Sequence, residues 1–209
     1  YFKITMEAPT AWRRLLYKDL ATRTLCGRTI DLGGSYQSGY YEIFHGEKNI
    51  TAVNMDEAYT SDVSFDIEKK FPVENEKYDT VLCINTLEHV YGHNHVVSES
   101  FRILQTKGVL YCAVPFLMYV HPCPKDYWRY TKDALEKIMT DAGFVSVYTR
   151  TIGSGPFLVC HQMLYPFFFF PIVRNVTFCI AQCLDFCLSK TGSYCEKYPL
   201  GYVVEAHKK

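Results

Sequence analysis

Residues 29–35 (TIDLGGS) combine an acid at the end of a short apolar run with two glycines immediately after it. Two glycines at this place let the backbone turn tightly and approach a ligand closely. The carboxylate of Asp31 would attract a cationic or amine-bearing ligand, whereas a pyrophosphate prefers bare backbone N–H groups. Gly33, Gly34 and Gly39 also lack the G-x-G-x-x-G spacing of dinucleotide-binding proteins. The pattern therefore favours a cationic ligand over NAD.

Polar residues follow the next apolar runs in the same way. Asn54 follows the second run, about 20 residues after Asp31, where such sheets place a residue that binds a ribose. Asp66 ends a third, shorter run and is placed to meet an adenine amino group, and residues 85–89 (NTLEH) end a fourth. Because ligands bind at the carboxyl ends of strands in an open parallel sheet, we expect these side chains to share one site.

The chain must fold so that these strand ends meet, and its patterning predicts how. The run 77–85 is almost continuously apolar, as is typical of a parallel strand that is covered on both faces. The expected elements are strands at 28–32, 49–55, 62–67, 77–85, 108–115, 144–152 and 201–208, and helices at 9–26, 37–45, 93–105 and 131–142. Their alternation predicts one α/β domain over residues 1–209, with a doubly wound, mostly parallel seven-stranded sheet and an antiparallel last strand.

Composition sets limits on the partners and the compartment. The chain has 22 Lys and Arg residues against 22 Asp and Glu, and this zero net charge argues against nucleic acid as the main ligand. Its nine cysteines are odd in number and form no C-x-x-C pair, which favours a reduced compartment over a disulfide framework. No signal peptide is visible at the start. We therefore expect a cytoplasmic protein, with membrane association left open by an aromatic stretch near the C-terminus.

Taken in order, these pieces resemble the class I S-adenosylmethionine-dependent methyltransferases, in particular methyltransferase type 11. The matching text runs from residue 28 to 150 and reads IDLGGS, AVNMDE, SFDIEKKFP, YDTVLCINTLEHV, FRILQTKGVLYCAVP and DAGF. The segment HPCPKDYWRYTKDALEKIMTDAGF resembles, more narrowly, small bacterial-type methyltransferases of glycan and cell-surface biosynthesis. The resemblance implies a Rossmann-like methyltransferase fold, S-adenosyl-L-methionine as the cofactor, and a small-molecule or glycan-like methyl acceptor.

The resemblance also implies roles for the strand-end residues. The implied cofactor-binding residues are Asp31, Gly33, Gly34 and Ser35 at the methionine end, Asn54 and Met55 at the ribose, Asp66 and Ile67 at the adenine, and Asn85, Leu87 and His89 closing over the cofactor. Three positions depart from the family pattern, because Ser35 and Gln37 replace glycines and Asn54 replaces an acid. These departures leave open a second interpretation, in which the chain is a binding module without catalytic activity.

Methyl transfer from a sulfonium is an in-line displacement, so the protein mainly aligns the reactants. An oxygen acceptor, which we expect here, usually also needs a base, and the residues after the fifth run supply two candidates, His121 and Asp126. Tyr127, Trp128 and Arg129 are the candidate substrate-binding residues, since a guanidinium can bind a carboxylate or phosphate with two hydrogen bonds. Alternatively, Asp126 and Arg129 pair with each other and fix the loop.

Histidines and cysteines elsewhere give only weak signals. His93, His95 and Cys123 suggest a metal site, but His-x-His alone is unspecific and no fourth ligand has a fitting spacing, so we expect no metal. Three further cysteines recur every four residues and predict one helical face packed in the core: Cys179, Cys183 and Cys187.

Residues 156–190 form an aromatic-rich insertion that is more apolar than a connection between two strands requires. Pro166, Pro171 and Arg174 interrupt it, so the uninterrupted run is shorter than the roughly 20 residues of a membrane-spanning helix. The favoured interpretation is a helical cover over the acceptor pocket or a homodimer contact. The alternative is a peripheral membrane contact through residues 157–188, as in a membrane-peripheral interaction protein. A nicotinamide-dependent oxidoreductase is the remaining rival on a similar sheet.

Overall fold

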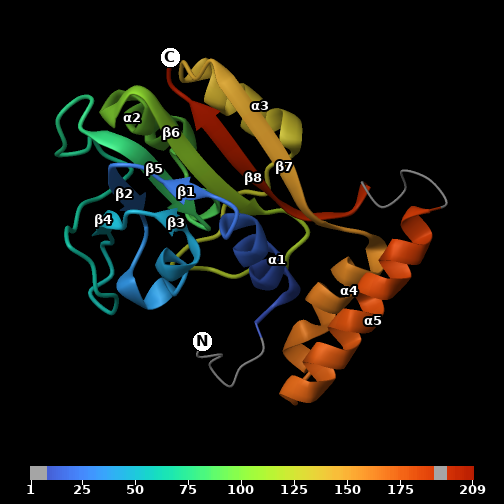
Figure 1. The fold of residues 1–209 in the computed structure, drawn as a ribbon. Coiled ribbons are helices and arrows are strands. Elements are labelled where there is room, and N and C mark those ends of the chain that lie inside the picture. Colours follow the sequence, from blue (N-terminus) through green and yellow to red (C-terminus); the bar gives the residue numbers. More distant parts are fainter. Residues whose placement is uncertain (1–8, 191–196) are drawn as a thin grey trace.

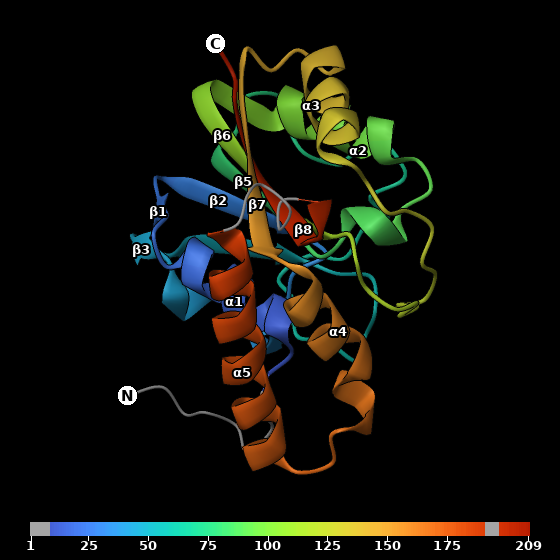
Figure 2. The ribbon, with the colours of Figure 1, turned by 90° about the vertical axis from the view of Figure 1, so that its right-hand side faces the viewer.

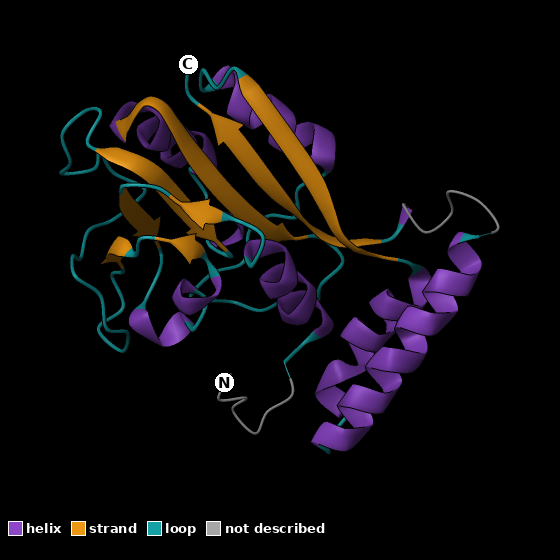
Figure 3. Ribbon diagram, in the orientation of Figure 1, coloured by secondary structure: helices purple, strands orange, loops and turns teal. Residues whose placement is uncertain are grey.

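The computed structural model describes residues 9–190 and 197–209, and its centre is a six-stranded sheet (Figures 1 and 3). The strands follow the spatial order β4-β2-β5-β6-β8-β7. Their bounds are β2 Arg28–Leu32, β4 Asn49–Val53, β5 Tyr78–Ile84, β6 Leu104–Pro115, β7 Ser146–Ser154 and β8 Pro199–His207. Strands β4, β2, β5 and β6 run parallel, and β8 runs antiparallel to both of its neighbours. The predicted fold class, with its antiparallel last strand, is therefore confirmed.

One predicted strand and one predicted helix are much reduced. The strand expected at 62–67 is a single parallel bridge between Val53 and Val63 at the edge of the sheet. The helix expected at 37–45 is replaced by two short 3₁₀ turns, η1 Tyr36–Ser38 and η2 Tyr41–Ile43. A separate two-stranded ribbon pairs β1 Thr24–Leu25 with β3 His45–Gly46. This pairing ends the first helix early, because residues 24 and 25 are extended rather than helical.

The described residues form five α-helices. They are α1 Ala11–Leu20, α2 His93–Ile103, α3 Lys132–Asp141, α4 Pro156–Leu164 and α5 Pro171–Ser189, with 3₁₀ turns η3 Leu87–His89 and η4 Tyr165–Phe167. Threonine side chains begin two of them, since Thr10 accepts from the Arg13 N–H and Thr131 accepts from the Ala134 N–H. Prolines begin α4 and α5, whereas α2 follows Gly92 without a side-chain cap.

The core lies on both faces of the sheet because alternate strand residues point to opposite sides. In β5, Val81 and Cys83 belong to one buried cluster, and Leu82 and Ile84 belong to another. The first cluster includes apolar residues of α2 and α3, and the second includes residues of α1 and η2. Both faces of the parallel strands are therefore covered, which explains why the run 77–85 is apolar throughout.

Helices α4 and α5 form a hairpin that extends away from the sheet (Figures 1 and 2). The hairpin touches the body through α1, where the Arg14 guanidinium binds Asn175 and lies 4.8 Å from the centre of the Phe178 ring. The large apolar side chains that remain exposed on it include Phe167, Phe169, Phe170, Ile172, Val176, Ile180 and Phe186. Residues 156–190 were interpreted as a helical cover over the acceptor pocket. That interpretation does not account for the apolar side chains exposed on the outer face of the hairpin.

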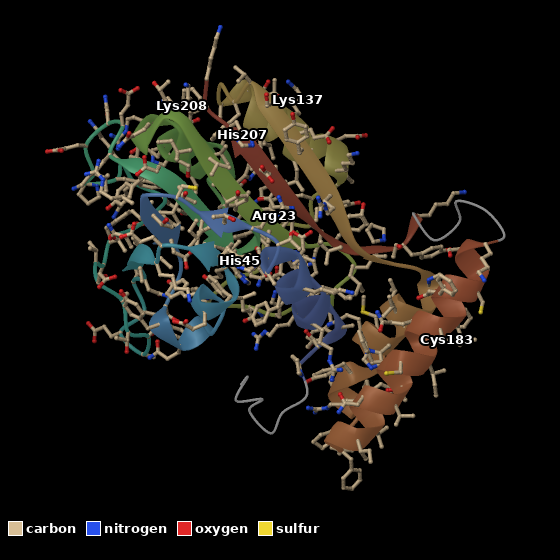
Figure 4. All side chains as sticks on the ribbon, in the orientation of Figure 1. Arg23, His45, Lys137, Cys183, His207 and Lys208 are labelled. Carbon is tan, nitrogen blue, oxygen red and sulfur yellow. The ribbon has the colours of Figure 1, made fainter. Side chains whose placement is uncertain are left out.

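Two expectations about α5 were wrong. By length and composition alone α5 could cross a membrane, since it has 19 residues, a mean hydropathy of 1.3 in its best window and only 17% of that window buried. The proline at 171 begins the helix instead of interrupting it, because the first helical position needs no N–H donor and proline has none. The cysteines at 179, 183 and 187 are exposed rather than packed in the core, and Figure 4 labels Cys183 on the outside of the hairpin.

Asp185 of α5 holds the start of α4. This carboxylate is 4% exposed, and it accepts hydrogen bonds from the N–H groups of Phe157 (3.1 Å) and Leu158 (2.8 Å). We expect Asp185→Ala to lower the free energy of unfolding by about 2 kcal/mol, because it leaves two buried N–H groups without an acceptor. Urea unfolding followed by circular dichroism measures the loss. Asp185→Asn, which keeps one acceptor oxygen, should lose less, and an unchanged midpoint in Asp185→Ala would contradict this role.

Candidate functional site

The carboxyl ends of the four parallel strands lie along one edge of the sheet and define the candidate site. Strand β2 leads into the glycine turn, β4 into Asn54, and β5 into Asn85 and the turn η3. Strand β6 leads into the long loop 116–130. The structure therefore brings the predicted cofactor and substrate residues to one edge, as parallel pairing requires.

The glycine turn is kept free of side chains by its neighbours. Gly33 has a φ of 77°, in the left-handed region, and a Cβ there would lie 2.5 Å from the Thr86 hydroxyl. A Cβ on Gly34 would overlap the carboxylate of Asp31. Ser35, which replaces a family glycine, is buried, and its hydroxyl lies 3.1 Å from that of Ser38. Both glycines are required by packing, and they leave bare backbone at the edge of the sheet.

Asp31 is covered rather than open to the crevice. Its side chain is fully buried, and Oδ2 accepts hydrogen bonds from the hydroxyls of Tyr40 (2.5 Å) and Tyr41 (2.8 Å). Burial raises the pKa of Asp31 to about 6, against the lowering effect of the two tyrosine hydrogen bonds. Within the described residues, Oδ1 has no hydrogen-bond partner. The expectation that this carboxylate points into an open crevice was wrong, because Tyr40, which precedes η2, and Tyr41, its first residue, cover the carboxylate.

Asn54 is bound to the glycine turn. Its Nδ2 donates to the carbonyl oxygens of Gly33 and Gly34 at 3.3 Å each, and its Oδ1 accepts from the N–H of Asp56 at 3.0 Å. A carboxylate could not donate these bonds, so the amide is the residue type that fits this turn. Met55 beside it is 58% exposed. The amide of Asn54, predicted at the ribose, therefore binds the two glycines predicted at the methionine end of the cofactor.

The residues predicted at the adenine have local roles in this structure. Asp66 accepts from the N–H of Glu68 at 2.9 Å and lies 3.3 Å from the Lys69 ammonium. Ile67 packs against the larger core cluster. Their contact with a cofactor stays a prediction.

Asn85 and Leu87 follow β5. Asn85 has a φ of 51°, and its Oδ1 accepts from the Trp12 indole N–H at 2.8 Å. Leu87 is fully buried and belongs to a core cluster, and its contact with a cofactor stays a prediction. Trp12 was not predicted at the site; a lone tryptophan in an amphipathic helix gave no signal for its contact with residue 85.

The loop 116–130 is fastened onto the turn after β5 by hydrogen bonds. The N–H groups of Tyr127 and Trp128 donate to the Glu88 carbonyl at 2.9 and 3.2 Å, and the Tyr130 hydroxyl donates to the Leu87 carbonyl at 3.1 Å. The Trp128 indole N–H donates to the Val90 carbonyl at 3.1 Å. These contacts bring the predicted substrate loop beside residues 87–90.

Asp126 and Arg129 pair with each other inside this loop. The guanidinium contacts both carboxylate oxygens, at 2.5 and 2.7 Å, and holds the pKa of Asp126 well below its usual range. Asp126 also accepts from the backbone N–H of His121 at 2.8 Å and lies 3.5 Å from Nδ1 of the same residue. The loop-fixing alternative therefore fits the geometry, and a carboxylate this weakly basic is a poor proton acceptor.

Glu88 was expected only as part of the turn that closes over the cofactor, and the burial of its carboxylate was not predicted. Its side chain is 0% exposed, and neither carboxylate oxygen has a hydrogen-bond partner within the described parts of the chain. Oε1 lies 3.8 Å from Nε2 of His89 and 3.8 Å from Nε2 of His121. Glu88 raises the pKa of His121 through this proximity. The available signal was a charged residue within an otherwise buried turn.

Comparison with known proteins agrees with this architecture. A family model described as a methyltransferase domain matches residues 33–112, which span the glycine turn, Asn54 and residues 85–89. The fold is that of the class I S-adenosylmethionine-dependent methyltransferases. No match was found among curated proteins.

Three solved structures illustrate the similarity. A Thermotoga maritima methyltransferase, described as a possible histamine N-methyltransferase, has a TM-score of 0.60 and 14% identity over 94% of this chain and 91% of its own. An Archaeoglobus fulgidus methyltransferase has a TM-score of 0.60 and 14% identity over 94% of each chain. One from Mesorhizobium loti has a TM-score of 0.58 and 12% identity over 98% of this chain and 100% of its own.

These comparisons support S-adenosyl-L-methionine as the cofactor. The bare glycine turn and the neighbouring amide of Asn54 fit a ligand with a cationic, amine-bearing end. So does the buried Asp31, whose Oδ1 has no hydrogen-bond partner in the part of the chain that the structure describes. Direct contact between Asp31 and that end would require Tyr40 and Tyr41 to move. The narrower resemblance to enzymes of glycan biosynthesis stays a prediction.

The burial of Asp31 makes the stability of the protein depend on pH. Its folded pKa of about 6 lies above the unfolded value of about 3.9, so wild-type stability falls as pH rises between these values and is level above them. Asp31→Asn does not titrate, and we expect its free energy of unfolding to rise relative to wild type by on the order of 3 kcal/mol across that window. Urea unfolding at several pH values measures the difference.

The exposed carboxylate of Asp141 provides the matched control. The difference between Asp141→Asn and wild type should change little over the same pH range. If the difference for Asp31→Asn is equally flat, Asp31 is not buried in the way described.

Proposed function

We propose that this chain is an enzyme that transfers the methyl group of S-adenosylmethionine to an oxygen atom of a small or glycan-like acceptor. The observation that carries the proposal is the position of Glu88, His89 and His121 at the edge of the sheet that bears the glycine turn. A hydroxyl acceptor must lose its proton as the methyl group arrives, and such a cluster of basic side chains suits that requirement.

The residues of the site divide into two groups in this proposal. The glycine turn and the side chains of Asn54 and Asn85 hold and orient the cofactor, which supplies the activated methyl group. His121 takes part in acceptor activation, and the Asp126–Arg129 pair holds the loop that carries it. Tyr127 is 46% exposed and is available to contact the acceptor. Alignment of the two reactants is the protein's main contribution.

A binding module without catalytic activity is the competing function. Two observations favour it: the tyrosine cover on Asp31 and the use of Asn54 to hold the glycine turn. Calorimetry and turnover separate the two functions, because a silent module binds the cofactor without forming S-adenosylhomocysteine from any acceptor.

We expect wild type to bind S-adenosylmethionine and S-adenosylhomocysteine in isothermal titration, and to form S-adenosylhomocysteine with hydroxyl acceptors from a sugar and small-molecule panel. His121→Ala should lower kcat by about 100-fold, because acceptor activation is lost, while cofactor Kd stays within a few fold. His45→Ala, an exposed histidine of β3, is the matched control and should leave both unchanged. No binding heat for either ligand would overturn the proposal, and unchanged kcat in His121→Ala would overturn this role of His121.

We further propose that the α4–α5 hairpin inserts its tip into the surface of a lipid bilayer, so that this cytoplasmic enzyme is held at a membrane. The tip carries Phe167, Phe169, Phe170 and Ile172, which are 68–79% exposed. Arg174 turns inward, because its Nε donates to the Phe168 carbonyl at 2.6 Å and its guanidinium lies 4.4 Å from the centre of the Tyr165 ring. The tip therefore presents aromatic surface without a projecting charge, which suits a bilayer interface.

Flotation with phosphatidylcholine and phosphatidylglycerol vesicles tests the membrane contact. We expect wild type to float, and the combined variant Phe167→Ser, Phe169→Ser and Phe170→Ser to stay in the dense fraction, because the inserted aromatic area is lost. Tyr148→Ser, which removes a 65% exposed aromatic from β7, should float like wild type. Flotation of the triple variant, or failure of wild type to float, would overturn the proposal. If wild type fails to float and dimerises in solution, a homodimer contact is favoured instead.

A further inference from the structure

We propose that Glu88, His89 and His121 form a binding site for one divalent transition-metal ion of the zinc class. One carboxylate oxygen and one imidazole nitrogen from each histidine lie within 4.8 Å of one another. Glu88 and His89 belong to the turn after β5, and His121 comes from the loop after β6. This ligand set has no residue in common with the set that the sequence suggested, which is His93, His95 and Cys123.

The hydrogen bonds of the two histidines direct their free nitrogens toward Glu88. Nδ1 of His89 lies 2.6 Å from the Lys125 carbonyl, and Nδ1 of His121 lies 3.1 Å from the Tyr119 carbonyl. A carbonyl only accepts, so the tautomer with the proton on Nδ1 satisfies both bonds and leaves each Nε2 with a lone pair; the Arg129 guanidinium also lies 3.4 Å from Nδ1 of His121. Two nitrogen lone pairs therefore converge with a carboxylate, and no donor separates them.

A cation is the partner that this arrangement lacks. Glu88 is completely buried, and among residues 9–190 and 197–209 neither of its oxygens has a hydrogen-bond partner, which is costly for a carboxylate. The 3.8 Å separations exceed hydrogen-bond length, so direct contact does not satisfy the group. Ligands that each lie about 2.1 Å from a zinc ion are about 3.4 Å apart at a tetrahedral angle and farther apart at wider angles. The two 3.8 Å separations between Glu88 and the histidines fall within this range.

The surroundings hold the ligands as a metal site requires. Metal-binding histidines usually donate their second ring N–H to a carbonyl or carboxylate, and both histidines here have that bond. The Asp126–Arg129 pair fixes the backbone N–H of His121. The aromatic rings of Trp128 and Tyr130 instead pack against His93, which lies outside the ligand set.

The ligand set indicates the kind of metal and its use. Two histidines and one glutamate are a ligand set of catalytic zinc sites, which keep one position open, and imidazole disfavours magnesium. His121 is 28% exposed on its side chain, so the open position is accessible from solvent. An acceptor hydroxyl bound there would become more acidic. That use rests on the proposed function, in which the metal would replace His121 in activating the acceptor, whereas metal binding itself does not depend on it.

Cobalt titration of the chelator-treated full chain, without cofactor or acceptor and with reductant present, tests the site. We expect one Co²⁺ per chain, visible d–d bands and no thiolate-to-cobalt charge-transfer band, because all three ligands are nitrogen or oxygen. Glu88→Gln should weaken Co²⁺ affinity at least about 100-fold, since it removes the only anionic ligand. The combined variant His95→Ala and Cys123→Ser is the matched control and should bind Co²⁺ like wild type.

Unfolding midpoints measured without metal distinguish the loss of a metal ligand from a failure of the variant to fold. Glu88→Gln preserves size and removes a buried charge, so its unfolding midpoint without metal should equal or exceed that of wild type, and Co²⁺ should no longer raise it. His89→Ala provides a second ligand variant with the same expected loss. Absence of d–d bands with wild type, or their persistence in both variants, would overturn the metal site. Cofactor binding measured separately reports on the proposed methyltransferase activity alone.

Discussion

The hydrogen bonds between the loop 116–130 and the carbonyls of residues 87, 88 and 90 are the contacts on which the candidate site depends. Without them, two segments that follow different strands would share only an edge of the sheet. With them, His121 is brought to within 3.8 Å of a buried carboxylate. The Asp126–Arg129 pair then rigidifies the loop from within, because a bidentate pair fixes both position and orientation.

Two buried carboxylates at this edge show how differently one fold can treat the same chemical group. Asp31 receives two tyrosine hydroxyls on one oxygen, and burial raises its pKa to about 6. Glu88 receives no hydrogen bond from the described residues, although two imidazoles face it. An isolated buried charge is costly, and it persists where the surrounding structure is strong enough to hold it. Both are groups that a ligand could complete.

The hairpin adds a second, separate feature to the molecule. A parallel sheet with both faces covered already satisfies its own apolar strands, so the fold does not need the aromatic surface of α5. The charges within the hairpin are instead turned inward, as Arg174 and Asp185 show. Its exposed apolar face is therefore a feature of interaction rather than of folding.

The sequence by itself determined the four parallel strands, the glycine turn and the edge at which the site lies. Strand patterning and the rule for parallel sheets are local properties, which is why the run 77–85 and the position of Asn54 could be interpreted without coordinates. Only the tertiary structure decided what Asp31 and Glu88 face. Tyr40 and Tyr41 cover Asp31 because two short 3₁₀ turns, over 36–38 and 41–43, replace the predicted helix. His121 reaches Glu88 because a loop 33 residues farther along the chain is fastened to its turn. Burial and distance between segments remote in sequence depend on packing of the whole chain, which no local pattern encodes.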